Sequence, residues 1–270
     1  MNAHLDWHLA RALLEWQAEL GVTEALEAQP LDRFALAAEA AVLRAAPVPQ
    51  RAARAAAPTP APPLLSDPDL GVAEAQRSAA AAPDLAALAE ALAAFPHCQL
   101  KLGARNCVFA DGNPKARVMI VGEGPGADED RLGRPFVGRA GQLLDLMFGA
   151  IGLSRQSPDP AKALYITNTV PWRPPGNREP TRDELAMLKP FLMRHIELAD
   201  PDLLVVVGNV ACDALLGLRG ILRLRGKWTE ALGRPALPML HPAYLLRSPE
   251  AKREAWADLL ALQVRLRSLS

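Results

Sequence analysis

The chain has 270 residues, 50% of them hydrophobic, and its 30 basic and 30 acidic residues give a formal net charge of zero. This length suits two average domains, or one large α/β domain with an extension, and the apolar content is enough for a sizeable core. No apolar run approaches the roughly 18 residues that a membrane span needs. Because three cysteines are too few for a disulfide framework, we expect a cytoplasmic protein.

The charges are unevenly distributed along the chain. Residues 1–100 contain 12 acidic and 6 basic residues, a net charge of −6, whereas residues 101–270 contain 18 acidic and 24 basic residues, a net charge of +6. Such an asymmetry indicates that the basic part meets a polyanion. A solvated surface rich in arginine is the alternative.

The N-terminal third is predicted to contain helices and a linker. Apolar residues recur at helical spacing, so residues 1–45 are expected to form a helical extension. Six prolines between residues 46 and 65 predict an extended linker over residues 46–66. Residues 67–97 are rich in Ala and Leu and are expected to form a helical lead-in. The N-terminus lacks the basic start of a signal peptide, so none is expected, and the acidic extension suggests a protein partner.

From residue 98 onward, short apolar runs alternate with helical patterns. Runs this apolar are typical of strands covered on both faces, and the alternation predicts a parallel sheet with helices on both sides. In such sheets the functional residues lie at the carboxyl ends of the strands. The predicted strands are 117–122, 164–168, 203–208 and 236–240, and the predicted helices are about 140–152, 181–199, 209–218 and 249–267.

Glycines and a carboxylate follow the first of these strands. Gly122, Gly124 and Gly126 let the backbone approach a ligand closely, and Glu123 places a carboxylate at the mouth of the strand. The spacing matches neither the dinucleotide motif GxGxxG nor the phosphate loop GxxxxGK[ST]. A tight strand-to-helix turn is the alternative interpretation.

Asn168 ends the second strand and begins a loop that is rich in proline and arginine. Its amide offers donors and an acceptor to the edge of a planar base, although an asparagine here also suits a simple turn. The prolines stiffen the loop. Arg173 and Arg178 give it positive charge, which suits contacts with a phosphate backbone.

The last strand is followed by His241 and the sequence Pro-Ala-Tyr-Leu-Leu-Arg. His241 is expected at the same sheet edge as Asn168. Leu245 and Leu246, next to Arg247, suit an exposed apolar wedge that enters a duplex and contacts DNA. The alternative is a helix start that packs these leucines into the core.

The segments GEGPGADEDRLGRPFVGRAGQLLD, ITNTVPWRPPGNREPT, LLVVVG and HPAYLLR together resemble the motifs of the family 4 uracil-DNA glycosylases. The resemblance runs from about Cys98 to Leu266, so the glycosylase domain is expected over residues 98–270. It implies a three-layer α/β/α fold around a central four-stranded parallel sheet. It also implies hydrolysis of the N-glycosidic bond of deoxyuridine in single- or double-stranded DNA, the first step of base excision repair.

The resemblance implies roles for one side of a base pocket. Glu123 and Gly124 fall on pocket positions, and Glu129 falls on the acidic position near C5 of uracil. Phe136 matches the aromatic residue that stacks on the base, and such stacking contributes roughly 1–3 kcal/mol.

The same resemblance assigns the polar groups of the reaction. Asn168 matches the amide that reads the uracil edge, and His241 matches the histidine near O2. Glu123, Asn168 and His241 are therefore the expected catalytic residues. They would act on a nucleotide flipped out of the duplex and stabilise the leaving uracil anion.

The family usually carries four cysteines that hold a [4Fe–4S] cluster. Aligned motifs place Phe95, Cys98, Trp172 and Leu188 at these positions, so one ligand of four remains. We therefore predict that no cluster and no other metal is bound. Apolar packing of the three replacements is expected to hold the same loops.

Two alternatives to a monofunctional uracil-DNA glycosylase stay open at this point. The first is a glycosylase of the same fold that acts on another deaminated base, such as hypoxanthine or xanthine. The second is a DNA-binding accessory module with little catalysis, which the acidic N-terminal extension favours. Incubation with uracil-containing oligonucleotides separates these possibilities.

Overall fold

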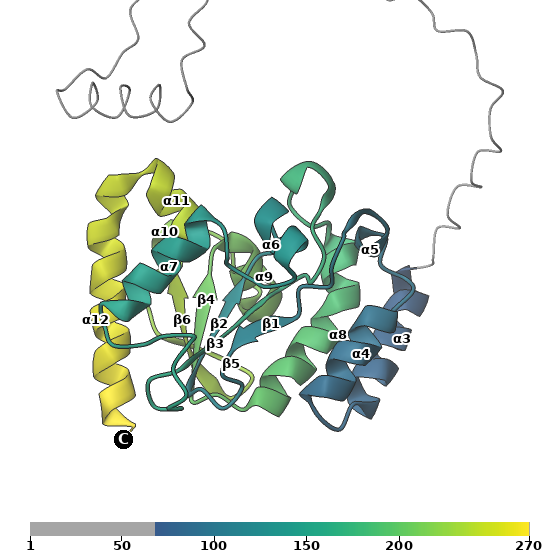
Figure 1. Cartoon of the computed structure of the whole chain (residues 1–270), viewed down its shortest axis with the longest axis horizontal. Coiled ribbons are helices and arrows are strands. Elements are labelled where there is room, and N and C mark those ends of the chain that lie inside the picture. The colour runs from purple at the N-terminus through teal and green to yellow at the C-terminus, as the bar shows by residue number, and fades with distance from the viewer. Residues whose placement is uncertain (1–67, 270) are drawn as a thin grey trace, which may run out of the picture. The chain divides into compact units, whose positions relative to one another are not determined.

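A six-stranded sheet lies at the centre of the computed structural model, which describes residues 68–269 (Figure 1). The predicted helical extension, residues 1–45, and the predicted linker, residues 46–66, lie outside the described residues. The strand order is β1-β3-β2-β4-β6-β5. The strands are β1 (Ala110–Gly112), β2 (Val118–Gly122), β3 (Leu164–Asn168), β4 (Leu203–Val207), β5 (Thr229–Ala231) and β6 (Arg234–Met239).

The four inner strands are the predicted parallel sheet. β3, β2, β4 and β6 pair in parallel, and the ends of β2 and β3 are aligned because Gly122 lies opposite Asn168. The two edge strands, β1 and β5, pair antiparallel with their neighbours and are an addition to the expected four. Each has only three residues, Ala-Asp-Gly and Thr-Glu-Ala. Neither therefore shows the apolar run by which a buried strand is predicted.

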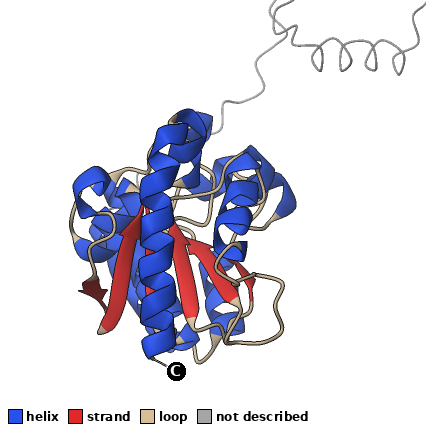
Figure 2. Ribbon diagram, turned by 90° about the vertical axis from the view of Figure 1, so that its left-hand side faces the viewer, coloured by secondary structure: helices blue, strands red, loops and turns tan. Residues whose placement is uncertain are grey.

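Helices cover both faces of the sheet, which gives the predicted three layers (Figure 2). On one face, Leu144 of α7 and Leu259 of α12 pack with Ile120 of β2. On the other face, Ile196 of α8 and Cys212 of α9 lie in one cluster with the alternate side chains of the strands. Successive side chains of a strand point to opposite faces, so a strand of uniformly apolar residues needs both covers.

The four helices predicted after residue 98 are all present as α7, α8, α9 and α12, with small shifts at their ends. None of the helices within residues 68–269 has the length and apolarity that crossing a membrane requires. The described helices are α3 (Pro68–Ala81), α4 (Leu85–Ala94), α5 (Leu100–Gly103), α6 (Ala127–Leu132), α7 (Arg139–Gly149), α8 (Arg182–Ala199), α9 (Asn209–Leu216), α10 (Ile221–Leu224), α11 (Pro242–Arg247) and α12 (Lys252–Ser268), and the described 3-10 turns are η1 (Pro175–Asn177) and η2 (Pro249–Ala251).

The lead-in helices α3 and α4 pack on the outer side of α8 (Figure 1). Ala75 of α3 and Leu88 of α4 are fully buried in a cluster that also holds Phe191 of α8. Asp84 ends the connection between them, because its side chain accepts a hydrogen bond from the Ala87 amide and caps α4. The lead-in thus shares a hydrophobic core with the loops that follow β3.

Candidate functional site

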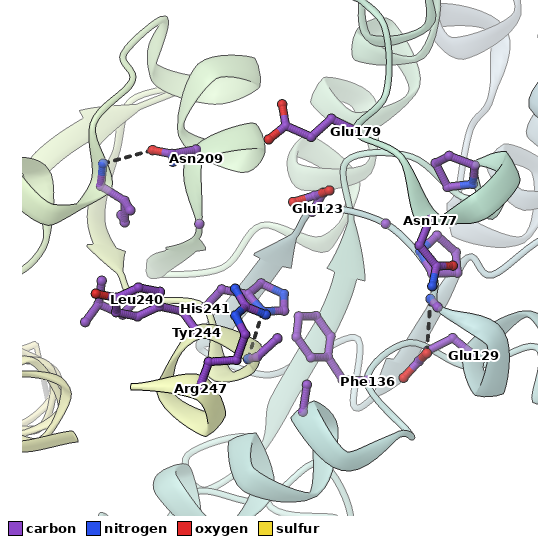
Figure 3. Close-up of a pocket in the computed structure, with 18 of the residues that line it drawn as sticks. Glu123, Glu129, Phe136, Asn177, Glu179, Asn209, Leu240, His241, Tyr244 and Arg247 are labelled. Atoms are coloured by element: carbon purple, nitrogen blue, oxygen red, sulfur yellow. Dashed lines mark hydrogen bonds between the residues drawn. The ribbon is translucent and has the colours of Figure 1, made fainter. Parts of the chain in front are cut away.

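A pocket of about 670 Å³ opens at the carboxyl edge of the parallel strands (Figure 3). Segments that follow β2, β3, β4 and β6 all contribute to its wall, as the topology of a parallel sheet requires. Its volume is in the range that small-molecule sites occupy, about 300–1,000 Å³. Of the predicted site residues, the pocket lining includes Glu123, Gly124, Glu129, Phe136, Arg178, His241 and Arg247.

Asn168 is not among the residues that line this pocket, although its amide lies close to the Phe136 ring, which does line it. The residue is 6% exposed, and its Oδ1 atom is buried without a hydrogen-bond partner among the described residues. A Cβ atom on Gly122 would lie 2.6 Å from this oxygen and 2.5 Å from the Phe136 ring. The amide and the ring therefore meet over the same glycine. An unsatisfied buried acceptor costs about 1–3 kcal/mol, so a ligand that brings a donor to this oxygen would recover that free energy.

Phe136 supplies the aromatic face of the pocket. Its ring stacks on the His241 imidazole, with centroids 5.6 Å apart and planes inclined by 28°, and Figure 3 shows the two rings side by side. The backbone of Phe136 has a φ of +52°, which few residues other than glycine adopt. The ring is thus directed into the pocket by a backbone conformation that needs support from its surroundings.

His241 is fixed by its place at the start of α11. Its Nδ1 atom accepts a hydrogen bond of 3.1 Å from the Ala243 amide, as an N-cap side chain does. Burial, and then the positive charge of Arg247, lower the pKa of His241 to about 4. The ring is therefore neutral near pH 7. Since Nδ1 is the acceptor, the proton lies on Nε2, which is left as a donor.

Glu123 is a partly buried carboxylate at the end of β2. Burial, followed by the carboxylate of Glu179, raises its pKa above the ordinary value, while Arg219 acts in the opposite direction. Glu123 and Glu179 both line the pocket. The Glu123 carbonyl also accepts a hydrogen bond of 3.2 Å from the Val170 amide, so the segments after β2 and β3 are tied together.

Glu129 ties the two halves of the glycine-rich segment together. Its Oε1 accepts hydrogen bonds from the amides of Val137 (2.9 Å) and Gly138 (2.8 Å), and its Oε2 accepts one from Gly126 (3.1 Å). The carboxylate therefore fixes the loop that carries Phe136. Such multiple backbone donors suit an ionised carboxylate.

Of the two leucines that were predicted to form an exposed wedge after His241, one is exposed and the other is buried. Leu245 is 0% exposed and packs with Leu240 and Ala255, so the expectation that its side chain is exposed is wrong. The segment forms the short helix α11, whose inner face buries Leu245 as the alternative interpretation proposed. Leu246 is 37% exposed, and Arg247 is exposed beside the pocket.

The two arginines of the loop after β3 are hydrogen-bonded to side chains close to them in the sequence. Arg178 binds Glu184 through two hydrogen bonds of 2.6 Å and 2.9 Å, and Glu184 caps α8 in turn. Arg173 donates to the Asn177 side-chain oxygen at 2.7 Å. Both therefore shape the loop, and Arg178 still presents 43% of its side chain to solvent.

Several residues of the pocket wall have no predicted role. Asn209 begins α9, and its side-chain oxygen accepts hydrogen bonds from the amides of Gly220 and Ile221 at 3.1 Å and 2.9 Å. This holds α10 against the pocket, and Leu222 of α10 is 62% exposed there. The sequence shows that Asn209 follows an apolar strand. It does not show that the Asn209 side chain binds the amides of Gly220 and Ile221, which lie in a separate segment.

The four positions of the iron–sulfur ligands meet in one apolar cluster. Phe95, Cys98, Trp172 and Leu188 are each at most 2% exposed and pack together. Burial raises the pKa of the Cys98 thiol to about 11, which disfavours the thiolate that a metal needs. Three of these side chains offer no ligand atom, so they do not fit a four-thiolate cluster. Within residues 68–269 no group of three His, Cys, Asp or Glu could hold a metal.

Comparison with known proteins identifies the family of this chain. Residues 109–260 match the family model of the uracil DNA glycosylase superfamily. The chain is 40% identical to a type-4 uracil-DNA glycosylase of Thermotoga maritima over 167 residues, 60% of this chain and 84% of that protein. It is 37% identical to the type-4 enzyme of Archaeoglobus fulgidus over 170 residues, which cover 60% and 82%. The type-4 enzyme of Pyrobaculum aerophilum is also 37% identical, over 187 residues that cover 65% and 91%.

Proposed function

This chain belongs to the uracil DNA glycosylase superfamily, and from that premise we propose that it is a uracil-DNA glycosylase that hydrolyses the N-glycosidic bond of deoxyuridine in DNA. The resemblance to family 4 is confirmed by the type-4 relatives. The reaction is the first step of base excision repair, and the protein would carry it out in the cytoplasm, on the DNA of the cell.

The observation that carries the proposal is the unpaired Oδ1 of Asn168, buried where the Phe136 ring closes over Gly122. Uracil offers an N3–H donor to this oxygen and an O4 acceptor to the amide N–H. Cytosine presents the opposite pattern, which leaves the amide unsatisfied at a cost of about 1–3 kcal/mol.

His241 would stabilise the charge that leaves with the base. Cleavage of the glycosidic bond puts negative charge on the uracil ring, and the neutral His241 can donate its Nε2–H to O2. Donors fixed before the reaction begins stabilise such charge without reorganisation. The capping bond from the Ala243 amide to Nδ1 supports this role, because it selects the tautomer.

Glu123 would act on the sugar side of the bond. Its carboxylate lines the same pocket as His241, and in its ionised form it would orient the attacking water or stabilise the developing positive charge on the sugar. Burial and Glu179 raise its pKa, so the ionised form is lost at a higher pH than for an exposed glutamate. Activity should therefore fall on the acid side.

We propose contacts with DNA for the exposed residues at the pocket rim. Arg247 and Leu246 of α11 are exposed, and Arg173 and Arg178 of the loop after β3 add positive charge near the opening. Phosphate contacts of this kind position a duplex without reading its sequence. Residues 1–95 are proposed to bind a protein partner.

The protein is proposed to act without an iron–sulfur cluster. The apolar packing of Phe95, Trp172 and Leu188 around Cys98 supports this, since burial of large side chains can hold the same segments that ligation holds. The purified protein should be colourless. About four irons per chain, with the matching absorption in the visible range, would overturn the proposal.

The central test is excision from defined oligonucleotides. Single- and double-stranded substrates with one uracil are incubated with the full chain and then cleaved with alkali, and matched substrates carry hypoxanthine, xanthine or cytosine. Cleavage of only the uracil substrates is expected. The lining residues include no lysine, so no nicking is expected before alkali. Preference for hypoxanthine or xanthine, or DNA binding without excision, would replace the proposal with one of the two alternatives.

A further inference from the structure

Phe136 is held in place by close packing against α7. Its φ of +52° is a conformation that persists in a non-glycine residue only when the surrounding structure fixes it. A Cβ atom on Gly141 of α7 would overlap the Phe136 carbonyl oxygen. The helix backbone therefore approaches the Phe136 backbone directly, and something must satisfy the carbonyl groups of this turn.

Arg155 satisfies them from the loop between α7 and β3. Its Nη2 donates to the Phe136 carbonyl at 2.9 Å, and its Nη1 donates to the Pro135 carbonyl at 2.9 Å. The two hydrogen bonds therefore bind consecutive backbone carbonyls, that of Pro135 before the Phe136 amide and that of Phe136 itself. The Arg155 side chain is 6% exposed, so these bonds are sheltered from competing water.

Two carboxylates fix the orientation of the Arg155 guanidinium in which it binds both carbonyls. The Arg155 Nε donates to Asp145 of α7 at 2.8 Å, and its Nη1 donates to Asp111 of β1 at 3.0 Å. All three nitrogens are thus engaged. The planar fork of arginine can serve several acceptors at fixed angles, whereas the ammonium group of lysine is a single point charge.

We propose that Arg155 is a positioning residue for the base pocket, which acts by fixing the Phe136 backbone and thereby the ring that receives the base. The inference rests on the proposed function, in which Phe136 stacks on the extruded base. Because Arg155 binds the carbonyls of Pro135 and Phe136, it holds the turn from which the ring projects towards His241. Small errors in the placement of groups in an active site cost up to about 100-fold in rate.

The test is a double-mutant cycle on single-turnover uracil excision with Arg155→Gln and Phe136→Ala. Each single variant is expected to slow excision about 10- to 100-fold. In the Phe136→Ala background, Arg155→Gln should change the rate by less than about twofold, because the ring that it positions is gone. A role in general stability would instead slow excision equally in both backgrounds.

Arg194→Gln is the matched control. Arg194 also donates to a backbone carbonyl, that of Ala82, at 2.9 Å and 3.2 Å, and it pairs with Glu197, but it lies on α8 away from the pocket. Its loss should lower the melting temperature and leave excision unchanged. Arg155→Lys, which keeps the charge but has a single donor nitrogen in place of three, should fold and restore part of the rate, so the cycle remains informative if Arg155→Gln is unstable.

The outcomes separate the inference from the proposed function. If Phe136→Ala is impaired and Arg155→Gln excises uracil at the normal rate, Arg155 has no positioning role and the function stands. If the Arg155→Gln loss is undiminished in the Phe136→Ala background, the inference also fails. If Phe136→Ala is unimpaired, the stacking role itself is wrong, and the inference falls with it.

Discussion

The Phe136 ring stacks on the His241 imidazole with centroids 5.6 Å apart, although the two residues come from opposite ends of the domain sequence. Each ring is fixed by its own segment. His241 caps α11 through Nδ1, and Phe136 sits in a turn of positive φ. The pocket thus has one aromatic and one polar face with set positions, which is the pre-organisation that electrostatic catalysis needs.

Removal of the polar groups should slow excision. We expect Glu123→Gln, Asn168→Ala and His241→Ala each to lower the single-turnover rate by at least about tenfold, within the range for single electrostatic groups. Asn113→Ala is the control for the asparagine, because Asn113 is not in the pocket and bonds Pro158 and Lys115. Wild-type rates in all three variants would refute the site assignment.

Gly122→Ala should close the base site without unfolding the protein. The new Cβ would lie 2.5 Å from the Phe136 ring and 2.6 Å from the Asn168 oxygen, so both groups must move. We expect at least a tenfold loss of excision, in line with the roughly 100-fold cost of a misplaced group. Gly149→Ala is the control, since its Cβ would meet nothing within 4 Å. Equal activity of the two variants would contradict this account.

The two leucines of α11 should separate stability from DNA contact. Leu245 is 0% exposed, so Leu245→Ala should lower the free energy of unfolding by about 2–5 kcal/mol. Leu246 is 37% exposed, and Leu246→Ala should leave stability within about 0.5 kcal/mol but weaken excision from duplex more than from single-stranded DNA. Urea denaturation and the two substrates measure these effects, and a reversed pattern would show that the wedge is Leu245.

Trp172 should be a stability determinant of the loop after β3. It is 2% exposed in the cluster with Phe95, Cys98 and Leu188, so Trp172→Ala should lower the free energy of unfolding by about 3–5 kcal/mol. Trp256→Ala is the matched control, because Trp256 is 44% exposed on α12. Similar urea midpoints for the two variants would mean that the cluster does not hold the loop.

Stability should decrease as the pH falls below about 6.5, because His195 is buried in its neutral form. Burial lowers its pKa from 6.5 to about 3, and its ring bonds the Tyr165 hydroxyl at 2.9 Å. Between these two values the unfolded chain binds a proton that the folded chain does not, so His195 destabilises the fold by about 2 kcal/mol at pH 5. Urea midpoints from pH 7 to pH 5 measure the slope. In the His195→Gln variant the urea midpoint should fall less between pH 7 and pH 5. A pH dependence equal to that of the wild type would argue against a neutral buried ring.

The parallel centre of the sheet and the location of the site could be predicted without a structure. The buried strands are continuous apolar runs, and Glu123, Asn168 and His241 lie at or just after the ends of three of them. Local pattern and sheet topology therefore suffice to bring them to one edge. The resemblance to family 4 also implied that Phe95, Trp172 and Leu188 stand where the family has cysteines, because aligned motifs are enough to assign those positions.

Which side chains face the pocket, and which groups hold them there, could not be predicted in this way, because both depend on how the elements pack. The pattern of α11 does not reveal that Leu245 is buried and Leu246 exposed, since that depends on how α11 meets Leu240 and Ala255. Arg155, in the loop before β3, binds the Phe136 carbonyl and also carboxylates of strand β1 and helix α7. Contacts of this kind depend on the packing of segments far apart in the chain, on which no local periodicity carries information.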